Sequence, residues 1–420
     1  MTIQPPQKSS PLAIGLKMFS SFKSPHYRLY FCTTVAHYAA MSMQIVSNPY
    51  LIYHLTDSKA LLGTMSLVSA GPMIIVSVFG GAVADRVRKK SLIIGGLSCL
   101  AVVSLIIAIV LATGILNSES RASWWILIIA SFIQGCIMGM MMPALQAIIP
   151  EIVSREQLMN AIAMNTLGMT LLNLLAPVIA GFIIGENANY KTVYYAMTGL
   201  YLTAIAFITF VPAKGKIISS GTRILADIQE GFKYIAKDGT ILRILIFTLI
   251  VVVLAMPFQQ LMPIFTDDIL KVGPPGMGLL MSISGAGAFV GAIFLAVMPN
   301  KKRGLILLLS GIIAGAALIV FSFSTVMGLS MIVIFFIGLA QAFRNTIGGA
   351  LLQSYTENAY MGRVMSIFNM QWGLMSVCTF LAGILAETVS VQYVLGSLSI
   401  LLVVLSIIFT GVFKNVRKVE

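Results

Sequence analysis

The sequence predicts an all-α membrane protein of twelve transmembrane helices in two pseudo-symmetric six-helix halves. Composition and hydropathy carry this prediction: 58% of the 420 residues are apolar, 10% are charged, and the mean hydropathy is +0.96. Soluble domains carry about 25% charged residues. A water-soluble chain of this composition would expose large apolar patches, which drive association. Lipid is therefore the expected outer solvent.

Apolar runs of the length that a bilayer requires, about 20 residues, recur along the whole chain. Six of them precede a polar interval, at residues 29–55, 61–84, 92–116, 124–149, 158–184 and 190–211. Six more follow it, at residues 241–265, 277–298, 305–323, 327–350, 364–386 and 391–413. Turn residues such as Pro299-Asn300 lie between the runs. The count gives twelve spans.

The polar segments complete the predicted domain organisation. We expect a cytoplasmic N-terminal segment, a first six-helix bundle, a cytoplasmic linker, a second six-helix bundle and a cytoplasmic tail, at residues 1–28, 29–212, 213–240, 241–413 and 414–420. In the linker, apolar residues recur at helical spacing among charged ones. This pattern predicts an amphipathic helix at the membrane interface, and a plain solvated linker is the alternative.

Lys and Arg residues set the orientation, because cytoplasmic loops carry an excess of them. If the N-terminus is cytoplasmic, 23 of the 27 Lys and Arg residues fall on that side, Arg344 included, and the other side keeps only Lys59, Arg121, Lys191 and Lys271. Both termini should then be cytoplasmic, in a plasma (inner) membrane. The net charge of +13 is thereby explained as a topology signal, so we expect no nucleic acid partner.

Residues typical of enzymes and cofactor sites are missing from the sequence pattern. The four cysteines, Cys32, Cys99, Cys136 and Cys378, lie inside apolar runs, where small buried side chains are usual. No Gly-x-x-x-x-Gly-Lys-Ser/Thr loop and no set of acids and bases within the spans is found. We therefore expect no disulfide, no metal, no cofactor and no enzymatic activity.

The most specific motif is Gly81-Ala-Val-Ala-Asp85-Arg86-Val-Arg-Lys89-Lys90, in the turn between the second and third spans. It resembles the signature of the major facilitator superfamily, although Arg88 stands where the family has a second glycine. An acid near a helix C-terminus is disfavoured unless it finds a partner. The resemblance implies that Asp85 acts as a conformational latch in the outward-facing state, and a solvated loop acid is the alternative. The implied conformational motif comprises Gly81, Asp85, Arg86, Lys89, Lys90, Gly362 and Arg363.

Further segments are similar to the exporter branch of that family that includes siderophore and macrolide efflux proteins. They are Arg28, Asn48-Pro49, residues 55–58, Pro143 with Pro150, and residues 227–232. Residues 176–181 are similar to an antiporter motif, with alanine in place of both leading glycines. The resemblance implies export of a small amphipathic or lipophilic molecule by alternating access, with proton antiport. An importer or facilitator of the same fold, or a non-transporting sensor or scaffold, stays open.

Polar residues within the spans predict the substrate pathway. Five residues of the first span share one face at helical spacing, and polar groups at membrane depth avoid lipid by facing a helix or a wet cavity. The resemblance places the first, fourth, seventh and tenth spans around a central path. The candidate lining residues are Thr34, His37, Met41, Gln44, Asn48, Gln134, Met138, Met256, Gln260 and Gln341. Ordinary packing between helices is the alternative for each.

Proton coupling has one candidate residue in the sequence. His37 is the only histidine well inside a span, and the acids lie near predicted helix ends or in loops. Histidine is the side chain most readily protonated near physiological pH. His37 is thus a candidate proton carrier, and a neutral hydrogen-bonding histidine is the alternative. The expected partners are a small-molecule substrate, the lipid bilayer and protons, bound by a monomer.

Overall fold

The computed structural model describes residues 20–116, 124–154, 156–212, 224–298, 302–357, 360–413 and 417. The side chains of residues 78–86 and 224–228 lie outside this description. Every regular element in the described ranges is a helix, which confirms the predicted all-α class. The elements of the first half are η1 (Ser20–Lys23), α2 (Pro25–Thr56), α3 (Lys59–Arg86), α4 (Lys89–Ala112), α5 (Trp125–Ile152), α6 (Leu158–Ile184) and α7 (Tyr190–Thr209).

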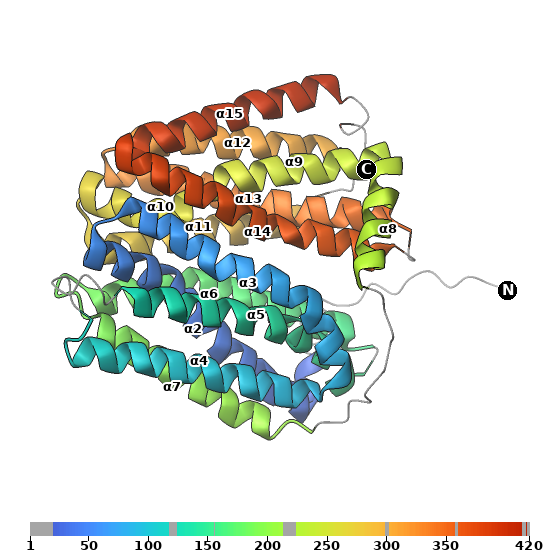
Figure 1. The fold of residues 1–420 in the computed structure, drawn as a ribbon. Coiled ribbons are helices and arrows are strands. Elements are labelled where there is room, and N and C mark those ends of the chain that lie inside the picture. The colour runs from blue at the N-terminus through green and yellow to red at the C-terminus, as the bar shows by residue number, and fades with distance from the viewer. Residues whose placement is uncertain are drawn as a thin grey trace.

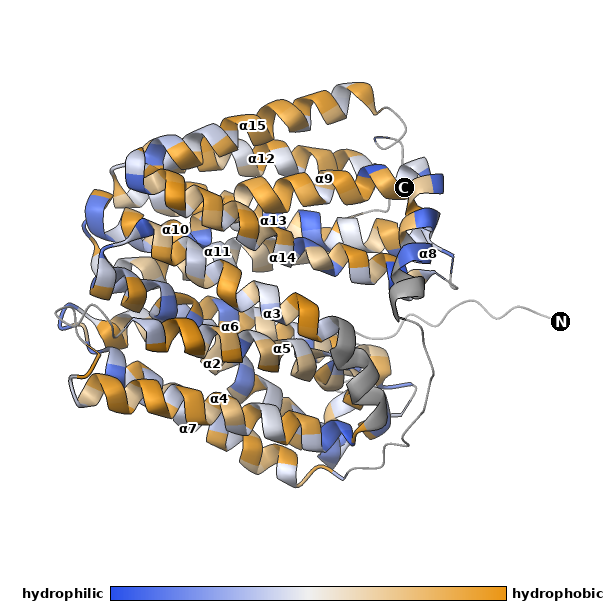
Figure 2. Cartoon of the chain, viewed as in Figure 1, coloured by the Kyte–Doolittle hydropathy of each residue, from blue (hydrophilic) through white to orange (hydrophobic). Residues whose placement is uncertain are grey.

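The remaining elements begin with a short amphipathic helix. They are α8 (Ile224–Lys237), α9 (Gly239–Ala255), α10 (Pro257–Ile264), η2 (Phe265–Ile269), α11 (Gly273–Val297), α12 (Arg303–Phe323), α13 (Met327–Tyr355), α14 (Met361–Thr388) and α15 (Val391–Val412). Hydrophobic residues cover the lengths of the long helices, and hydrophilic residues gather toward the two ends of the molecule (Figure 2).

Eleven helical segments of the described chain are long and apolar enough to cross a bilayer, and α2 is not among them. The helix has 32 residues, so its length is sufficient. Its polar side chains lower its hydropathy, and most of them are buried inside the protein, including Thr33, His37 and Ser47, each 0% exposed. A helix whose polar groups face other helices can span a membrane without apolar composition throughout.

The seventh predicted span, residues 241–265, is not one continuous helix. It is divided into α9, α10 and a π-helical turn, η2. Pro257 begins α10, and a proline cannot donate the backbone hydrogen bond that would continue the preceding helix. The extension through η2 carries Asp267 and Asp268 on the same spanning segment.

The long helices form two groups, which lie one above the other in Figure 1. In the first group α2 packs along α6 and α7, α4 along α5 and α7, and α3 along α5. In the second group α13 packs along α11 and α12, α15 along α12, and α9 against α14 and α15. We call these groups the first and second bundle.

The two bundles meet along two helix pairs, α6 with α11 and α3 with α14. Both crossings use glycine. A Cβ atom at Gly63 of α3 would lie 2.8 Å from the Cα atom of Phe380, and one at Gly383 of α14 would lie 2.7 Å from the carbonyl oxygen of Lys59. A Cβ at Gly278 of α11 would overlap the carbonyl oxygen of Pro177, within the antiporter-like segment. Small residues thus allow the backbones to approach closely.

Helix α8 lies across the ends of helices of the second bundle (Figure 1). It packs against α14 and α9. Tyr234 stacks on Tyr360 with ring centres 4.2 Å apart, and Ile235 is buried. We call the end of the molecule that carries α8 the α8 end, and the opposite end, which carries η2, the η2 end.

Candidate functional site

The η2 end carries hydrogen bonds that join the two bundles. Tyr53 of α2 donates to Oδ2 of Asp268 at 2.8 Å, and Tyr50 donates to Oδ1 of Asp267. Glu387, at the end of α14, accepts from the Ser58 hydroxyl at 2.7 Å and from the backbone N–H of Ala60 at 2.9 Å. These four hydrogen bonds hold the bundles together at this end.

A polar network deeper in the first bundle links α2, α5 and α7. The Tyr194 hydroxyl donates to Oδ1 of Asn48 at 2.5 Å, and Asn48 Nδ2 donates to Oε1 of Gln134 at 3.4 Å. Gln44 Nε2 donates to the same oxygen. The structure therefore brings together three of the sequence-predicted pathway residues. Nε2 of Gln134 is buried and has no hydrogen-bond partner, so both N–H groups of this amide remain for a ligand or for water.

Two other members of the predicted stripe on α2 are packed inside the first bundle. His37 is 0% exposed, and neither ring nitrogen has a hydrogen-bond partner. Its ring centre lies 6.1 Å from that of Tyr201 on α7, whose hydroxyl is also without a partner. Thr34 is buried and donates to the carbonyl of Phe31 in its own helix at 3.0 Å. Met41 is half-buried.

The second bundle contains an arginine that is buried within one of its long helices. Arg344 was grouped with the basic residues of the cytoplasmic side, but it lies within α13 and is 1% exposed. It precedes the end of α13 by about 11 residues, or about 16 Å of helix. The usable signal was its position inside the apolar run 327–350, where a charge is costly and usually functional.

The surroundings of Arg344 are polar and aromatic. Its Nη2 donates to Oδ1 of Asn345, and its Cζ lies 5.9 Å from the centre of the Trp372 ring on α14. Nε of Arg344 and Nε2 of the predicted pathway residue Gln341 are buried without hydrogen-bond partners. This cluster combines a fixed positive charge, amide groups and an aromatic face.

The remaining predicted pathway residues are spread over α5, α9 and α10. Met138 of α5 and Gln260 of α10 are half-buried. Met256 is 0% exposed at the junction of α9 and α10. Within the part of the chain that the structure describes, no three His, Cys, Asp or Glu side chains lie close enough to hold a metal ion.

The α8 end contains the residues of the predicted conformational motif. The side chains of Gly81, Asp85 and Arg86 lie outside the described residues, so the predicted Asp85 latch stays a prediction. Lys89 forms an ion pair with Glu151 of α5, and Lys90 donates to the carbonyl oxygen of Thr209 at 2.7 Å.

The start of α14 lies at the same end. Arg363 forms an ion pair of 2.7 Å with Glu230 of α8, and its Cζ lies 5.3 Å from the centre of the Tyr360 ring. Gly362 is exposed. The ion pair and the Tyr234–Tyr360 stack together attach α8 to the second bundle.

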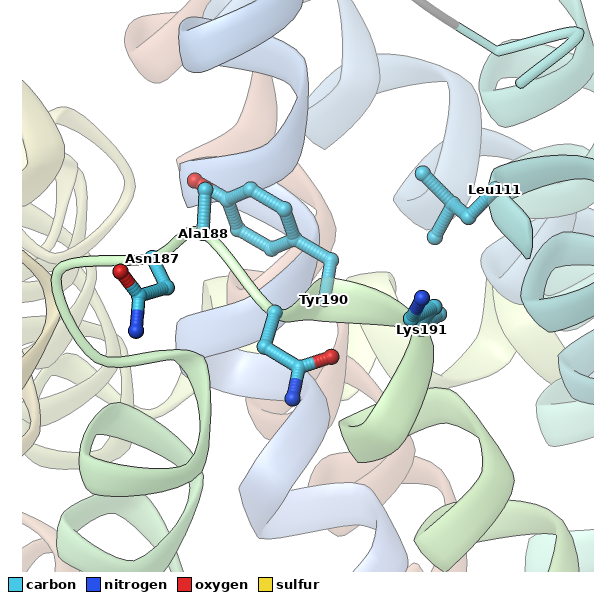
Figure 3. A pocket seen from close by; sticks show the side chains of 6 residues that line it. Leu111, Asn187, Ala188, Tyr190 and Lys191 are labelled. Carbon is cyan, nitrogen blue, oxygen red and sulfur yellow. The ribbon is translucent and has the colours of Figure 1, made fainter.

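A surface hollow of about 350 Å³ lies where the α6–α7 loop meets the end of α4 (Figure 3). Its lining residues are Leu111, Asn187, Ala188, Asn189, Tyr190 and Lys191. None of the polar clusters described above contributes to it. We therefore build the candidate site on the two buried clusters rather than on this hollow.

The chain matches known transporters along most of its length. The model of the Major Facilitator Superfamily matches residues 30–378 and 261–420. Macrolide efflux protein A of Streptococcus pyogenes is 20% identical over 387 residues, covering 90% of this chain and 93% of the relative. The enterobactin exporter EntS of Escherichia coli O1:K1 / APEC is 22% identical over 350 residues, covering 83% of this chain and 82% of the exporter.

Solved structures share the fold. The nucleoside transporter NupG is similar with a TM-score of 0.70 at 14% identity, covering 93% of this chain and 99% of NupG. A bacterial homolog of the human lysosomal transporter Spinster, in an inward-facing and unoccupied conformation, has a TM-score of 0.66 at 13% identity. The match covers 95% of this chain and 96% of the homolog. With the family match over most of the chain, these likenesses lead to one conclusion: the protein is a multi-pass membrane transporter that belongs to the major facilitator superfamily.

Proposed function

We propose that this transporter exports a small amphipathic molecule from the cytoplasm by alternating access, driven by proton antiport. The observation that carries the proposal is the set of hydrogen bonds that joins the two bundles at the η2 end, beyond the polar clusters at mid-depth. A transporter of this kind must close one end while substrate reaches its site from the other. The Tyr–Asp pairs at η2 are suited to be the closure that opens and re-forms.

The direction of transport is inferred from orientation and from relatives. The Lys and Arg distribution supports a cytoplasmic α8 end and an external η2 end, with both termini cytoplasmic and the chain in the plasma membrane. Closure at the η2 end then corresponds to an inward-facing state. The macrolide and enterobactin exporters, which align with most of this chain, support efflux.

The substrate pathway in this proposal runs between the two buried clusters. Gln44, Asn48 and Gln134 form its wall in the first bundle, and Gln341 forms part of its wall in the second. Buried amides can bind polar groups of varied substrates, because each carries both donors and acceptors. Both bundles belong to one chain, so a monomer is sufficient for the cycle.

Accumulation of a panel of amphipathic compounds in cells with and without the protein, at two external pH values, tests the proposal. Export predicts lower accumulation in expressing cells, and proton antiport predicts a larger difference at the lower external pH. A Gln134→Leu variant at equal protein level should lose most of the difference, whereas Gln392→Leu, near the start of α15, should not. Higher accumulation in expressing cells would instead make the protein an importer.

A further inference from the structure

Arg344 is a buried cation that has no anionic partner among the described residues. It is 1% exposed, its Nη2 donates to the neutral Asn345 amide, and its guanidinium lies over the Trp372 ring. The ion pairs found among the described residues, Lys89 with Glu151 and Arg363 with Glu230, do not include it. Arginine stays charged in proteins. An unpaired charge inside a protein is strongly disfavoured, so this arginine calls for an anion during the transport cycle.

A second unsatisfied donor lies one helical turn from the arginine. Residues three and four apart on a helix are neighbours on its surface, so Gln341 adjoins both Arg344 and Asn345. Nε2 of Gln341 and Nε of Arg344 are both buried without hydrogen-bond partners. Two donors without acceptors in one cluster suit a ligand that accepts hydrogen bonds.

The lipid-facing side of α13 shows which way the cluster faces. Leu329, Ile332 and Phe336 are exposed at helical spacing, at 43%, 60% and 45%, and mark the side toward lipid. At about 100° per residue, Asn345 lies on the opposite side of the helix. Asn345 is nevertheless exposed, so its side chain faces an open space on the side of α13 that is turned away from lipid.

The same comparison holds for α14. Leu374, Val377 and Leu381 are exposed and mark its lipid side. Trp372, which is 42% exposed, lies about half a turn around the helix from them. Its neighbour Gly373 faces Ile74 of α3 in the first bundle. The open face of Trp372 is therefore directed toward the space between the bundles.

We propose that Gln341, Arg344, Asn345 and Trp372 form a binding site for a carboxylate on an amphipathic, aromatic substrate. This inference rests on the proposed transport function and names its substrate class. A guanidinium binds a carboxylate through two parallel hydrogen bonds, the Gln341 amide supplies a further donor, and the indole ring stacks on the apolar part of the ligand. The substrate carboxylate thus serves as the counter-ion of Arg344.

Binding to the purified protein in lipid nanodiscs tests this site directly. The chain has 3 tryptophans, so a Trp124→Phe/Trp125→Phe parent leaves Trp372 as the sole tryptophan fluorophore. The probes are phenylbutyrate and its neutral analogue phenylbutyramide, which differ in charge at similar shape. We expect the acid to bind at least about tenfold more tightly than the amide, equivalent to about 1.4 kcal/mol.

Variants separate the charge of Arg344 from its structural role. Arg344→Gln should remove the preference for the acid, and Arg344→Lys should retain part of it because a lysine cannot form the two-bond pair. Arg243→Gln is the matched control: this arginine also lies over an aromatic ring, that of Phe413 at 5.2 Å, in another part of the bundle. The preference of the Arg243→Gln variant for the acid over the amide should equal that of the parent.

Equal binding of acid and amide by the parent, or a preference that survives Arg344→Gln, would overturn the site. If Arg344→Gln does not fold, Gln341→Leu should still lower the affinity for the acid several-fold, and the acid–amide comparison in the parent needs no site variant. Because binding is measured without a gradient, its failure is distinct from failure of export, which the cell assay detects.

Discussion

The hydroxyl of Tyr53 in α2 donates a hydrogen bond of 2.8 Å to Oδ2 of Asp268 in η2, which ties the first bundle to the second. Tyr50, about one turn earlier, does the same with Asp267. Hydrogen bonds to charged groups contribute about 1.5–3 kcal/mol each. We therefore expect the two bonds together to favour the closed arrangement of this end.

Removing the Tyr53 hydroxyl should open the η2 end. Loss of about 1.5 kcal/mol from the closed state shifts the open-to-closed ratio about tenfold. The measurement is the distance between spin labels at Lys191 and Thr388, two exposed positions at this end on different bundles. Tyr53→Phe should populate longer distances. Tyr393→Phe, which alters a tyrosine 65% exposed on α15, should leave the distribution unchanged.

Substitution at the helix crossing of Gly63 should impair closure of the η2 end as much as loss of the hydrogen bonds does. A Cβ there would lie 2.8 Å from Phe380 Cα and 2.9 Å from the carbonyl oxygen of Thr379, both backbone atoms of α14. Overpacking costs about 1–3 kcal/mol, so Gly63→Ala should reduce transport roughly tenfold at equal protein level.

Gly71 provides the control on the same helix. A Cβ added at Gly71 meets nothing within 4 Å, so Gly71→Ala should keep full transport. If both variants transport normally, the α3–α14 approach has no part in closing the η2 end.

The sequence was informative about the spans and much less so about the contacts between them. Apolar runs predicted the long helices, because burial in lipid requires them, although α2 is less apolar than the other spans. The break at Pro257 could have been read, since proline ends a helix, but the run of apolar residues across it concealed the break. The Tyr53–Asp268 pair joins residues 215 positions apart, and no local pattern indicates such a partner.

The candidate site was predicted unevenly for a similar reason. Gln44, Asn48 and Gln134 were found because amides are rare in apolar runs, and the structure joins them. Spacing along α2 also grouped His37 with them, yet His37 lies against Tyr201 of α7. A shared helical face does not reveal which neighbouring helix covers it at each depth.

The orientation is testable by labelling from outside intact cells. In a background lacking Cys32, Cys99, Cys136 and Cys378, Lys191→Cys should react with an impermeant thiol reagent, and Lys237→Cys should react only after permeabilisation. Both positions are exposed in the structure, so a difference reflects the membrane side and not burial. The opposite pattern would invert the proposed direction of transport.

Protons should act on the Tyr–Asp pairs of the η2 end and not on His37. A carboxylate accepts a tyrosine hydrogen bond roughly twice as strongly as a neutral group, so protonation of Asp267 or Asp268 weakens the closure. Acidification should therefore lengthen the Lys191–Thr388 distance in the parent protein. In an Asp267→Asn/Asp268→Asn variant, the open fraction should be high and independent of pH.

His37→Gln provides the decisive comparison, since glutamine is polar but takes up no proton near neutral pH. His37 is 0% exposed, and neither ring nitrogen has a hydrogen-bond partner that would stabilise a charged imidazole. The variant should therefore keep both the pH-dependent opening and pH-driven transport. The opposite result would be loss of both properties in His37→Gln, while the Asp267→Asn/Asp268→Asn variant still responds to pH. That result would assign the coupling proton to the histidine, and the Tyr–Asp pairs would have no role in coupling.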